Sequence, residues 1–276
     1  MESETGWWLI RHPDHAELAG AFAAAWGNAL FRKPEPRQRV LHGIARHDDG
    51  WAVRDAHPSI TRQGKPSAFS TELVGKYSAF EEIDLQDYLA VRDRAVRMIA
   101  EKDPYAGLLI ALHTYNLLTA HADRSTITPE GLLLLDAFLE RQRGYQDELR
   151  AAIEADATLT PRAQAEQTVT EHFRLLQACD NLSLLTCVAY TSPAHLLHPL
   201  SLNDGSTSEV QVFPLGPRHF RLEPWPFAEA ELTFEFPARH VAGKTFGSSE
   251  QLTAAYLAAE EQRLSVTLSR SVTAPH

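Results

Sequence analysis

The chain has 276 residues, 44% of them hydrophobic and 22% charged, which is typical of a globular protein with one sizeable core. Its formal net charge of −10 and its lack of a basic run argue against a nucleic-acid partner. It has no apolar stretch of about 18 residues and begins with the acidic Met1-Glu2-Ser3-Glu4, so we expect no membrane span, no signal peptide and a cytoplasmic location.

Apolar residues at helical spacing predict that the chain is mainly helical up to about residue 192. We expect helices over residues 15–30, 37–48, 87–101, 105–122, 128–156 and 160–190. Between the second and third of these, residues 55–82 are rich in Pro, Gly, Ser and polar groups and predict a long loop. Because long loops within compact domains are often functional, this one is a candidate lid over a site.

Alternating polar and apolar residues then predict strands over residues 209–213, 220–222, 231–236 and 264–268, with a short helix over 249–262 between the last two. We therefore expect a mainly α protein of mixed α+β composition. Residues 1–200 would form a helical metal-binding domain. Residues 201–276 would form a small antiparallel β lobe that is packed on it and too small to stand alone.

Four polar residues share otherwise apolar helix faces, which points to a metal site. His47 and Asp48 end the second predicted helix, His15 lies in the first and Asp180 in the last. A buried carboxylate is costly unless it is paired or bound to a cation. Imidazole and carboxylate ligands together suit a divalent Mn, Fe, Zn or Mg ion, so we expect one ion at these residues, or two if His113 contributes.

The ordered set His15, His47-Asp48 and Asp180 resembles the H…HD…D pattern of the HD superfamily of metal-dependent phosphohydrolases. The runs His47-Asp48-Asp49-Gly50 and Asp180-Asn181-Leu182-Ser183 resemble that family's local motifs. The resemblance implies an HD-like helical bundle over about residues 8–192. It also implies hydrolysis of a small phosphorylated metabolite or nucleotide by metal-activated water. Trp51 stands where many members carry Lys or Arg, so a phosphate contact is missing there.

A second resemblance covers nearly the whole chain and is to a bacterial family catalogued only as a domain of unknown function. It is carried by runs such as Trp8-Leu9-Ile10, His47-Asp48-Asp49-Gly50-Trp51, Cys179-Asp180-Asn181-Leu182-Ser183-Leu184 and Pro224-Trp225-Pro226-Phe227. It implies that the helical and sheet parts belong together, and it supplies no substrate.

Three further residues are candidates for catalysis. His113, on an apolar face, could ligate a second ion or act as a general acid or base. Arg46 and Lys65 are the candidate cations for a substrate phosphate, although each also suits a solvated surface position.

Two alternatives to a hydrolase stay open. An HD-type di-iron oxygenase would use His113 and His121 with Asp48 bridging the irons, but these histidines lie about 12 Å apart along one helix. A non-catalytic ligand-binding or assembly protein with a degenerate site would fit Trp51 and the absence of an evident cationic pocket. We expect a small-molecule substrate, and a homo-oligomer is possible.

Overall fold

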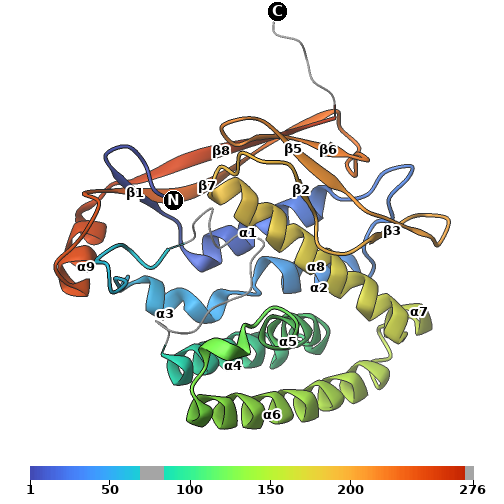
Figure 1. Cartoon of the computed structure of the whole chain (residues 1–276). Helices are drawn as coiled ribbons and strands as arrows, with labels where there is room; N and C mark the ends of the chain where they lie inside the picture. The colour runs from blue at the N-terminus through green and yellow to red at the C-terminus, as the bar shows by residue number, and fades with distance from the viewer. Residues whose placement is uncertain (69–83, 271–276) are drawn as a thin grey trace, which may run out of the picture.

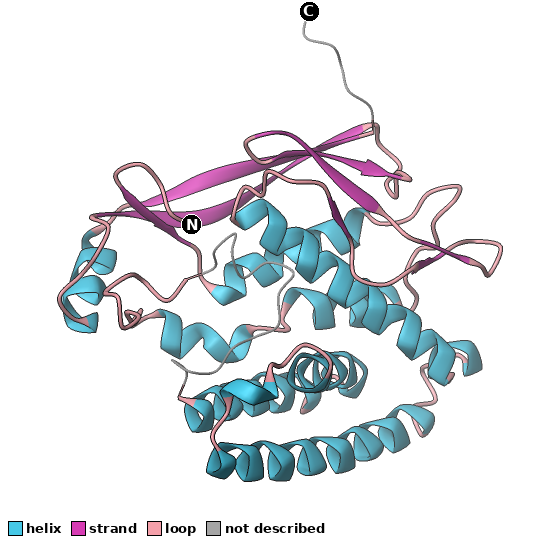
Figure 2. Cartoon of the chain, viewed as in Figure 1, coloured by secondary structure: helices cyan, strands magenta, loops and turns pink. Residues whose placement is uncertain are grey.

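A curled sheet covers one side of a helical body in the computed structural model, which describes residues 1–68 and 84–270 (Figure 1). Helices α1, α2 and α8 lie beneath the sheet, and α4, α5 and α6 form a layer farther from it (Figures 1 and 2). The protein is therefore an α+β fold in which the layer between the sheet and the outer helices carries most of the predicted metal ligands.

The helices mostly match the predicted segments. They are α1 His12–Ala25, α2 Arg37–Ala45, α3 Ala52–Asp55, α4 Leu85–Ala100, α5 Pro104–Thr119, α6 Pro129–Glu154, α7 Pro161–Gln164, α8 Glu166–Cys187 and α9 Ser249–Ala258, with 3-10 turns η1 Asp49–Trp51 and η2 Arg124–Thr126. Side-chain caps fix several starts: Asp84, Asp103 and Thr128 each accept a hydrogen bond from the first turn of the helix that follows.

Several predicted helices differ in extent, and two of these differences bear on the fold. The first helix begins three residues early, because Pro13 suits a first helical turn. It ends at Ala25, because the next residue, Trp26, has an extended backbone that forms a bridge with Phe227. The predicted helix over 160–190 is divided into α7 and α8, because Ala165 is extended, with ψ of 135°. Of the predicted loop, residues 69–82 lie outside the described part of the chain.

The sheet has the order β1-β7-β8-β6-β5-β2. Its strands are β1 Gly6–Leu9, β2 Ala194–His195, β5 Gln211–Gly216, β6 His219–Glu223, β7 Glu231–Ala242 and β8 Glu261–Ser269; β3 Leu200–Ser201 and β4 Thr207–Ser208 pair separately. The sheet is mainly antiparallel, as expected, but it also contains a parallel pair, and the expectation that it is drawn only from the C-terminal part is wrong. The N-terminal β1 pairs with β7, and β6 runs parallel to β8.

One hydrophobic core joins the sheet to the helices. Phe22 of α1 packs edge-on against Phe234 of β7 at 4.9 Å, and Trp26 packs against Phe227 at 5.7 Å between ring centroids. Burying a large apolar side chain is worth roughly 1.5–3 kcal/mol, so these contacts fix α1 firmly under the sheet. The opposite side of α1 is thereby held against α2 and α8, where the predicted ligands lie.

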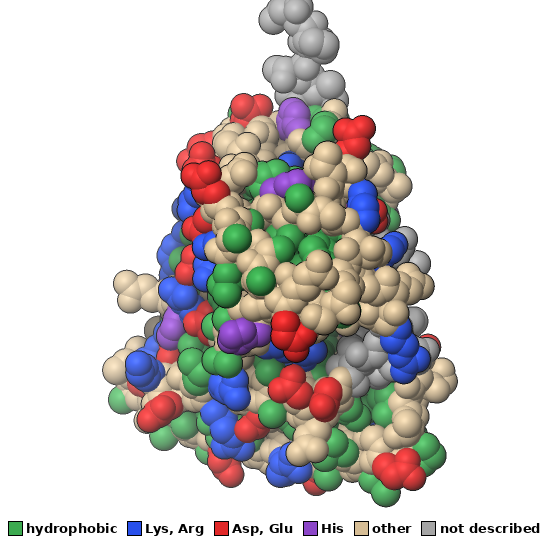
Figure 3. All heavy atoms as spheres, turned by 90° about the vertical axis from the view of Figure 1, so that its left-hand side faces the viewer, with side chains coloured by type: hydrophobic (Ala, Val, Ile, Leu, Met, Phe, Trp, Pro, Cys, Tyr) green, Lys and Arg blue, Asp and Glu red, His purple; other side chains and the backbone are tan. Residues whose placement is uncertain are grey.

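Neither the surface charge on one face nor the apolar character of the helices marks a special environment among the described residues. On the face drawn in Figure 3, acidic and basic side chains are interspersed among the described residues and do not form an area of one sign. Among the helices of the described ranges, none combines the length and apolar character needed to cross a bilayer.

Candidate metal centre

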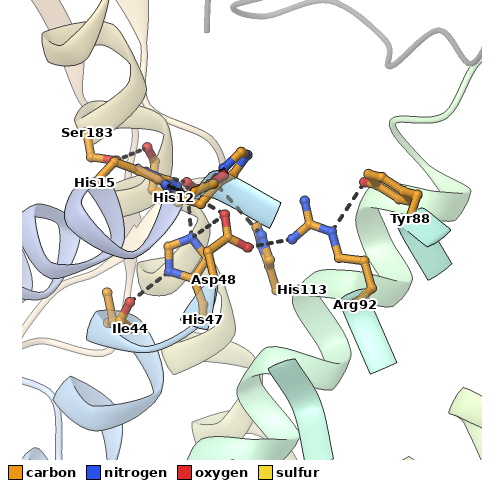
Figure 4. Close-up of polar contacts among 11 residues, drawn as sticks. His12, His15, Ile44, His47, Asp48, Tyr88, Arg92, His113 and Ser183 are labelled. Carbon is orange, nitrogen blue, oxygen red and sulfur yellow. Dashed lines mark hydrogen bonds and ion pairs between the residues drawn. The ribbon is translucent and has the colours of Figure 1, made fainter. Parts of the chain in front are cut away.

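The four predicted ligands lie in one buried cluster, although they come from three separate parts of the chain. His15 projects from α1, His47 and Asp48 from the turn after α2, and Asp180 from α8. His15 Nε2 lies 3.1 Å from Asp48 Oδ2, and His47 Nε2 lies 3.4 Å from Asp180 Oδ1. All four residues are buried (Figure 4 shows the two histidines and Asp48).

A close backbone approach places the His47-Asp48 turn. Helix α2 ends at Ala45, three residues before the predicted end, and a turn over residues 46–48 connects it to η1. A Cβ atom on Gly50 would lie 2.5 Å from the Val91 carbonyl oxygen of α4, so only glycine allows η1 to pack this closely. This packing brings Asp48 against α4, where its Oδ1 accepts a hydrogen bond from Arg92 Nη1 at 2.6 Å.

The His47 ring is held in one tautomer. Its Nδ1 donates to the Ile44 carbonyl oxygen at 2.8 Å, and a carbonyl can only accept. The neutral ring therefore carries its lone pair on Nε2. That atom is buried, has no hydrogen-bond partner among the described residues, and faces Asp180. A carbonyl that fixes one imidazole nitrogen and directs the other at a cation is the usual outer support of a metal-binding histidine.

His15 is held in the same way by a serine. Ser183 Oγ donates its only proton to the Asp180 carbonyl oxygen at 2.8 Å, so the His15 Nδ1 at 2.9 Å must donate to Ser183. The neutral His15 ring then presents a lone pair at Nε2 to the Asp48 carboxylate, 3.1 Å away. Two lone pairs at this distance repel each other unless a proton or a metal ion lies between them.

The carboxylates of the cluster are ionised. Burial raises the pKa of Asp48, but Arg92 and His47 outweigh it and hold that pKa well below the ordinary range. Burial also opposes ionisation of Asp180, yet the surrounding histidines, His47 first, lower its pKa to about 2. These residues therefore offer negative ligand oxygens at neutral pH.

The histidines differ in charge. Burial lowers the pKa of His47, but Asp48 and Asp180 raise it by more, and the resulting pKa is about 9. In the absence of a competing cation this ring therefore holds a proton at pH 7. Burial lowers the pKa of His15 in spite of Asp48 and Asp180, and that of His113 to about 3. His15 and His113 are therefore neutral.

The spacing of these ligand atoms suits metal coordination. With bonds of about 2.1 Å, neighbouring ligand atoms of a tetrahedral or octahedral shell lie about 3.0–3.4 Å apart. The pairs at 3.1 and 3.4 Å match that spacing, and His47 Nε2 lies somewhat farther, 3.8 Å, from Asp48 Oδ2. The cluster comprises two overlapping groups that could hold a metal ion, one of His15, His47 and Asp48, the other of His47, His113 and Asp180.

The cluster opens into a cavity of about 330 Å³. The described part of the predicted lid forms one of its walls through Pro58, Ser59 and the segment Pro66-Ser67-Ala68. Trp51 forms another wall and stacks on His12 at 4.3 Å between ring centroids. A small molecule in this cavity would thus contact the proposed ligands directly.

A second histidine–carboxylate pair lines the same cavity. Asp55 accepts hydrogen bonds from His12 Nδ1 at 2.9 Å and from the His12 backbone N–H at 2.6 Å. This orients the ring and makes Nε2 its basic atom. The ring centroids of His12 and His15 are 6.1 Å apart, so the pair lies beside the metal cluster.

Of the other sequence candidates, only His113 joins the cluster, with its Nε2 3.8 Å from Asp180 Oδ2. Arg46 is about half-exposed and pairs with Glu17 at 3.0 Å, and neither Arg46 nor Lys65 lines the cavity. His121 likewise lies outside the cavity lining. The structure therefore does not bring Arg46, Lys65 or His121 to the cluster.

The cation at the cluster is Arg92, which sequence reasoning missed. It is 7% exposed and lies on the apolar face of α4, four residues after Tyr88 and four before Val96. An arginine on such a face was the available signal, since a buried charge needs a partner. Its guanidinium lies between Asp48 and Tyr88, as Figure 4 shows.

Comparison with known proteins gives one match. The family model described as "Protein of unknown function (DUF3891)" matches residues 1–243, which include the whole cluster and most of the sheet. Neither a curated protein nor a solved structure matches the chain. Because the matched segment is most of the sequence, the chain belongs to the DUF3891 family.

Proposed function

We propose that this protein is a metal-dependent hydrolase of the HD type acting on a small phosphorylated molecule. One divalent ion would be held by His15, His47, Asp48 and Asp180. The observation that carries the proposal is the pair of buried, tautomer-fixed imidazole nitrogens that face two ionised carboxylates at the base of a cavity. When bound, such an ion would acidify a water molecule and polarise a phosphoryl oxygen.

The charge around the site supports an anionic substrate. A divalent ion would balance Asp48 and Asp180, and Arg92, which pairs with Asp48, would then give the cluster one net positive charge. Within the described chain, the second terminal nitrogen of Arg92, Nη2, has no hydrogen-bond acceptor. A guanidinium is well suited to phosphoryl oxygens because its N–H groups are planar and always charged.

His12 is the group best placed to move a proton in this reaction. With Nδ1 held by Asp55, its Nε2 can give a proton to a leaving oxygen and take one from water. Trp51 supports the ring by stacking and would help to exclude water from the cavity wall. We propose that His12 and Trp51 fill these roles in a site that has no Lys or Arg after the His-Asp-x-Gly turn.

The test is phosphate release by purified protein loaded with Mn²⁺, from a panel of nucleotides, sugar phosphates and p-nitrophenyl phosphate. His47→Gln should lose both the ion and the activity. His42→Gln, a change on α2 at a side chain 39% exposed, should retain both. A wild-type protein that binds Mn²⁺ stoichiometrically but releases no phosphate from any compound would oppose hydrolysis of phosphate esters. A protein that binds no metal would oppose the whole proposal.

A further inference from the structure

We propose that Arg92 takes the place that a second metal ion would need, so that the cluster holds a single ion and the guanidinium acts as its partner cation toward the substrate. This inference rests on the proposed function and deepens it. It names the residue that sets the metal count and that binds the second oxygen of the substrate's phosphoryl group.

The ligand set is too small for two ions while Arg92 is in place. The two groups of metal-binding residues share His47, and one imidazole nitrogen binds one ion. If His47 serves the ion beside His15 and Asp48, a second ion near His113 keeps only that ring and Asp180. With Asp180 Oδ2, 3.8 Å from His113 Nε2, such an ion has only two protein ligands, and it would need the other Asp48 oxygen as a third.

That oxygen is already bound to Arg92. Asp48 Oδ1 accepts from Arg92 Nη1 at 2.6 Å, the length of a strong charge-assisted hydrogen bond. The guanidinium is buried, carries a permanent positive charge and is surrounded by aromatic rings, with its carbon 5.2 Å from the Trp51 ring centre and 5.3 Å from that of Tyr88. A second ion would have to break this hydrogen bond and lie beside a fixed positive charge.

The same placement makes Arg92 a substrate contact. Nε is directed at the Tyr88 hydroxyl, 3.3 Å away, and Nη1 at Asp48, so the plane of the guanidinium is fixed. Nη2 belongs to a cavity-lining residue and has no acceptor among the described residues. A phosphoryl group with one oxygen on the ion would therefore place another on Nη2, which fits a terminal phosphate monoester.

The closing experiment counts Mn²⁺ ions per chain by elemental analysis and by electron paramagnetic resonance, in which two neighbouring ions give a spin-coupled signal. Wild type should bind one uncoupled ion. Arg92→Ala should bind two coupled ions, and so should Arg92→His, which supplies an imidazole if the alanine variant does not fold. Arg97→Ala, at an exposed arginine of the same helix that pairs with Asp93, should match wild type.

A second arm titrates inorganic phosphate into the Mn²⁺-loaded protein. Arg92→Lys keeps the charge but loses the planar donor pair, so the phosphate Kd should rise about tenfold with the metal count still one. Two ions in wild type, one ion in both Arg92→Ala and Arg92→His, or an unchanged phosphate Kd in Arg92→Lys would overturn the inference while leaving a metal-dependent enzyme possible. A wild type without any bound ion would instead overturn the proposed function.

Discussion

Metal binding should depend on pH because one ligand holds a proton that the ion must displace. The carboxylates of Asp48 and Asp180 raise the pKa of His47 to about 9, whereas burial keeps His15 and His113 neutral. Below pH 9 each ion bound therefore releases about one proton from His47. The unprotonated fraction of His47 rises from about 0.3% at pH 6.5 to about 9% at pH 8, so the apparent affinity should increase about 30-fold.

The assay is competition for Mn²⁺ with a chelator of known proton affinity at pH 6.5, 7, 7.5 and 8. Calorimetry in buffers of different ionisation enthalpy counts the protons released. His42→Gln should keep the full pH dependence, because His42 lies toward Asp103 and away from the cluster. An affinity that is constant across this range, or binding without proton release, would refute the assignment of His47 as a ligand raised in pKa by its carboxylate neighbours.

Three substitutions test the supports of the site. Ser183→Ala should weaken Mn²⁺ binding by about 10–100-fold, because it frees the His15 ring, and chelator competition that finds wild-type affinity would contradict this. Gly50→Ala should lower the free energy of unfolding by roughly 1–3 kcal/mol, because its Cβ would meet the α4 backbone; an unchanged urea transition would show that η1 can shift. Asp55→Asn should leave metal content unchanged but reduce phosphate release about 100-fold, by removing the acceptor that orients His12. Equal activity of that variant would exclude the His12 pair from proton transfer.

The sequence predicted the helical elements well because their signals are local. Apolar spacing, the caps at Asp103 and Thr128, and prolines at helix starts act within a few residues. The sheet was harder, because pairing between distant segments leaves little local trace. Strand β1 lies more than 220 residues from its partner β7, and its run Trp7-Trp8-Leu9 lacks the polar alternation that marks a half-buried strand.

The same distinction applies to the site. His15, His47, Asp48 and Asp180 could be proposed together because each is a polar residue on an apolar helix face. Their surroundings could not be derived, because they arise where elements meet. Arg92 reaches Asp48 across 44 residues, His12 meets Asp55 across 43, and Ser183 supports His15 across 168. Arg46, adjacent to His47 in sequence, turns outward to Glu17, which shows that proximity along the chain is a poor guide to the cation of a site.

The most direct test is the location of a bound metal. Crystals of the protein grown with Mn²⁺ or Zn²⁺ would be measured at the absorption edge of that metal, and the anomalous map would place the ion. We predict one peak within about 2.0–2.3 Å of His15 Nε2, His47 Nε2 and an oxygen of Asp48 and of Asp180, with Arg92 still bound to the other Asp48 oxygen. A fully loaded crystal whose only peaks lie elsewhere, or whose cluster stays closed by hydrogen bonds, would contradict the account.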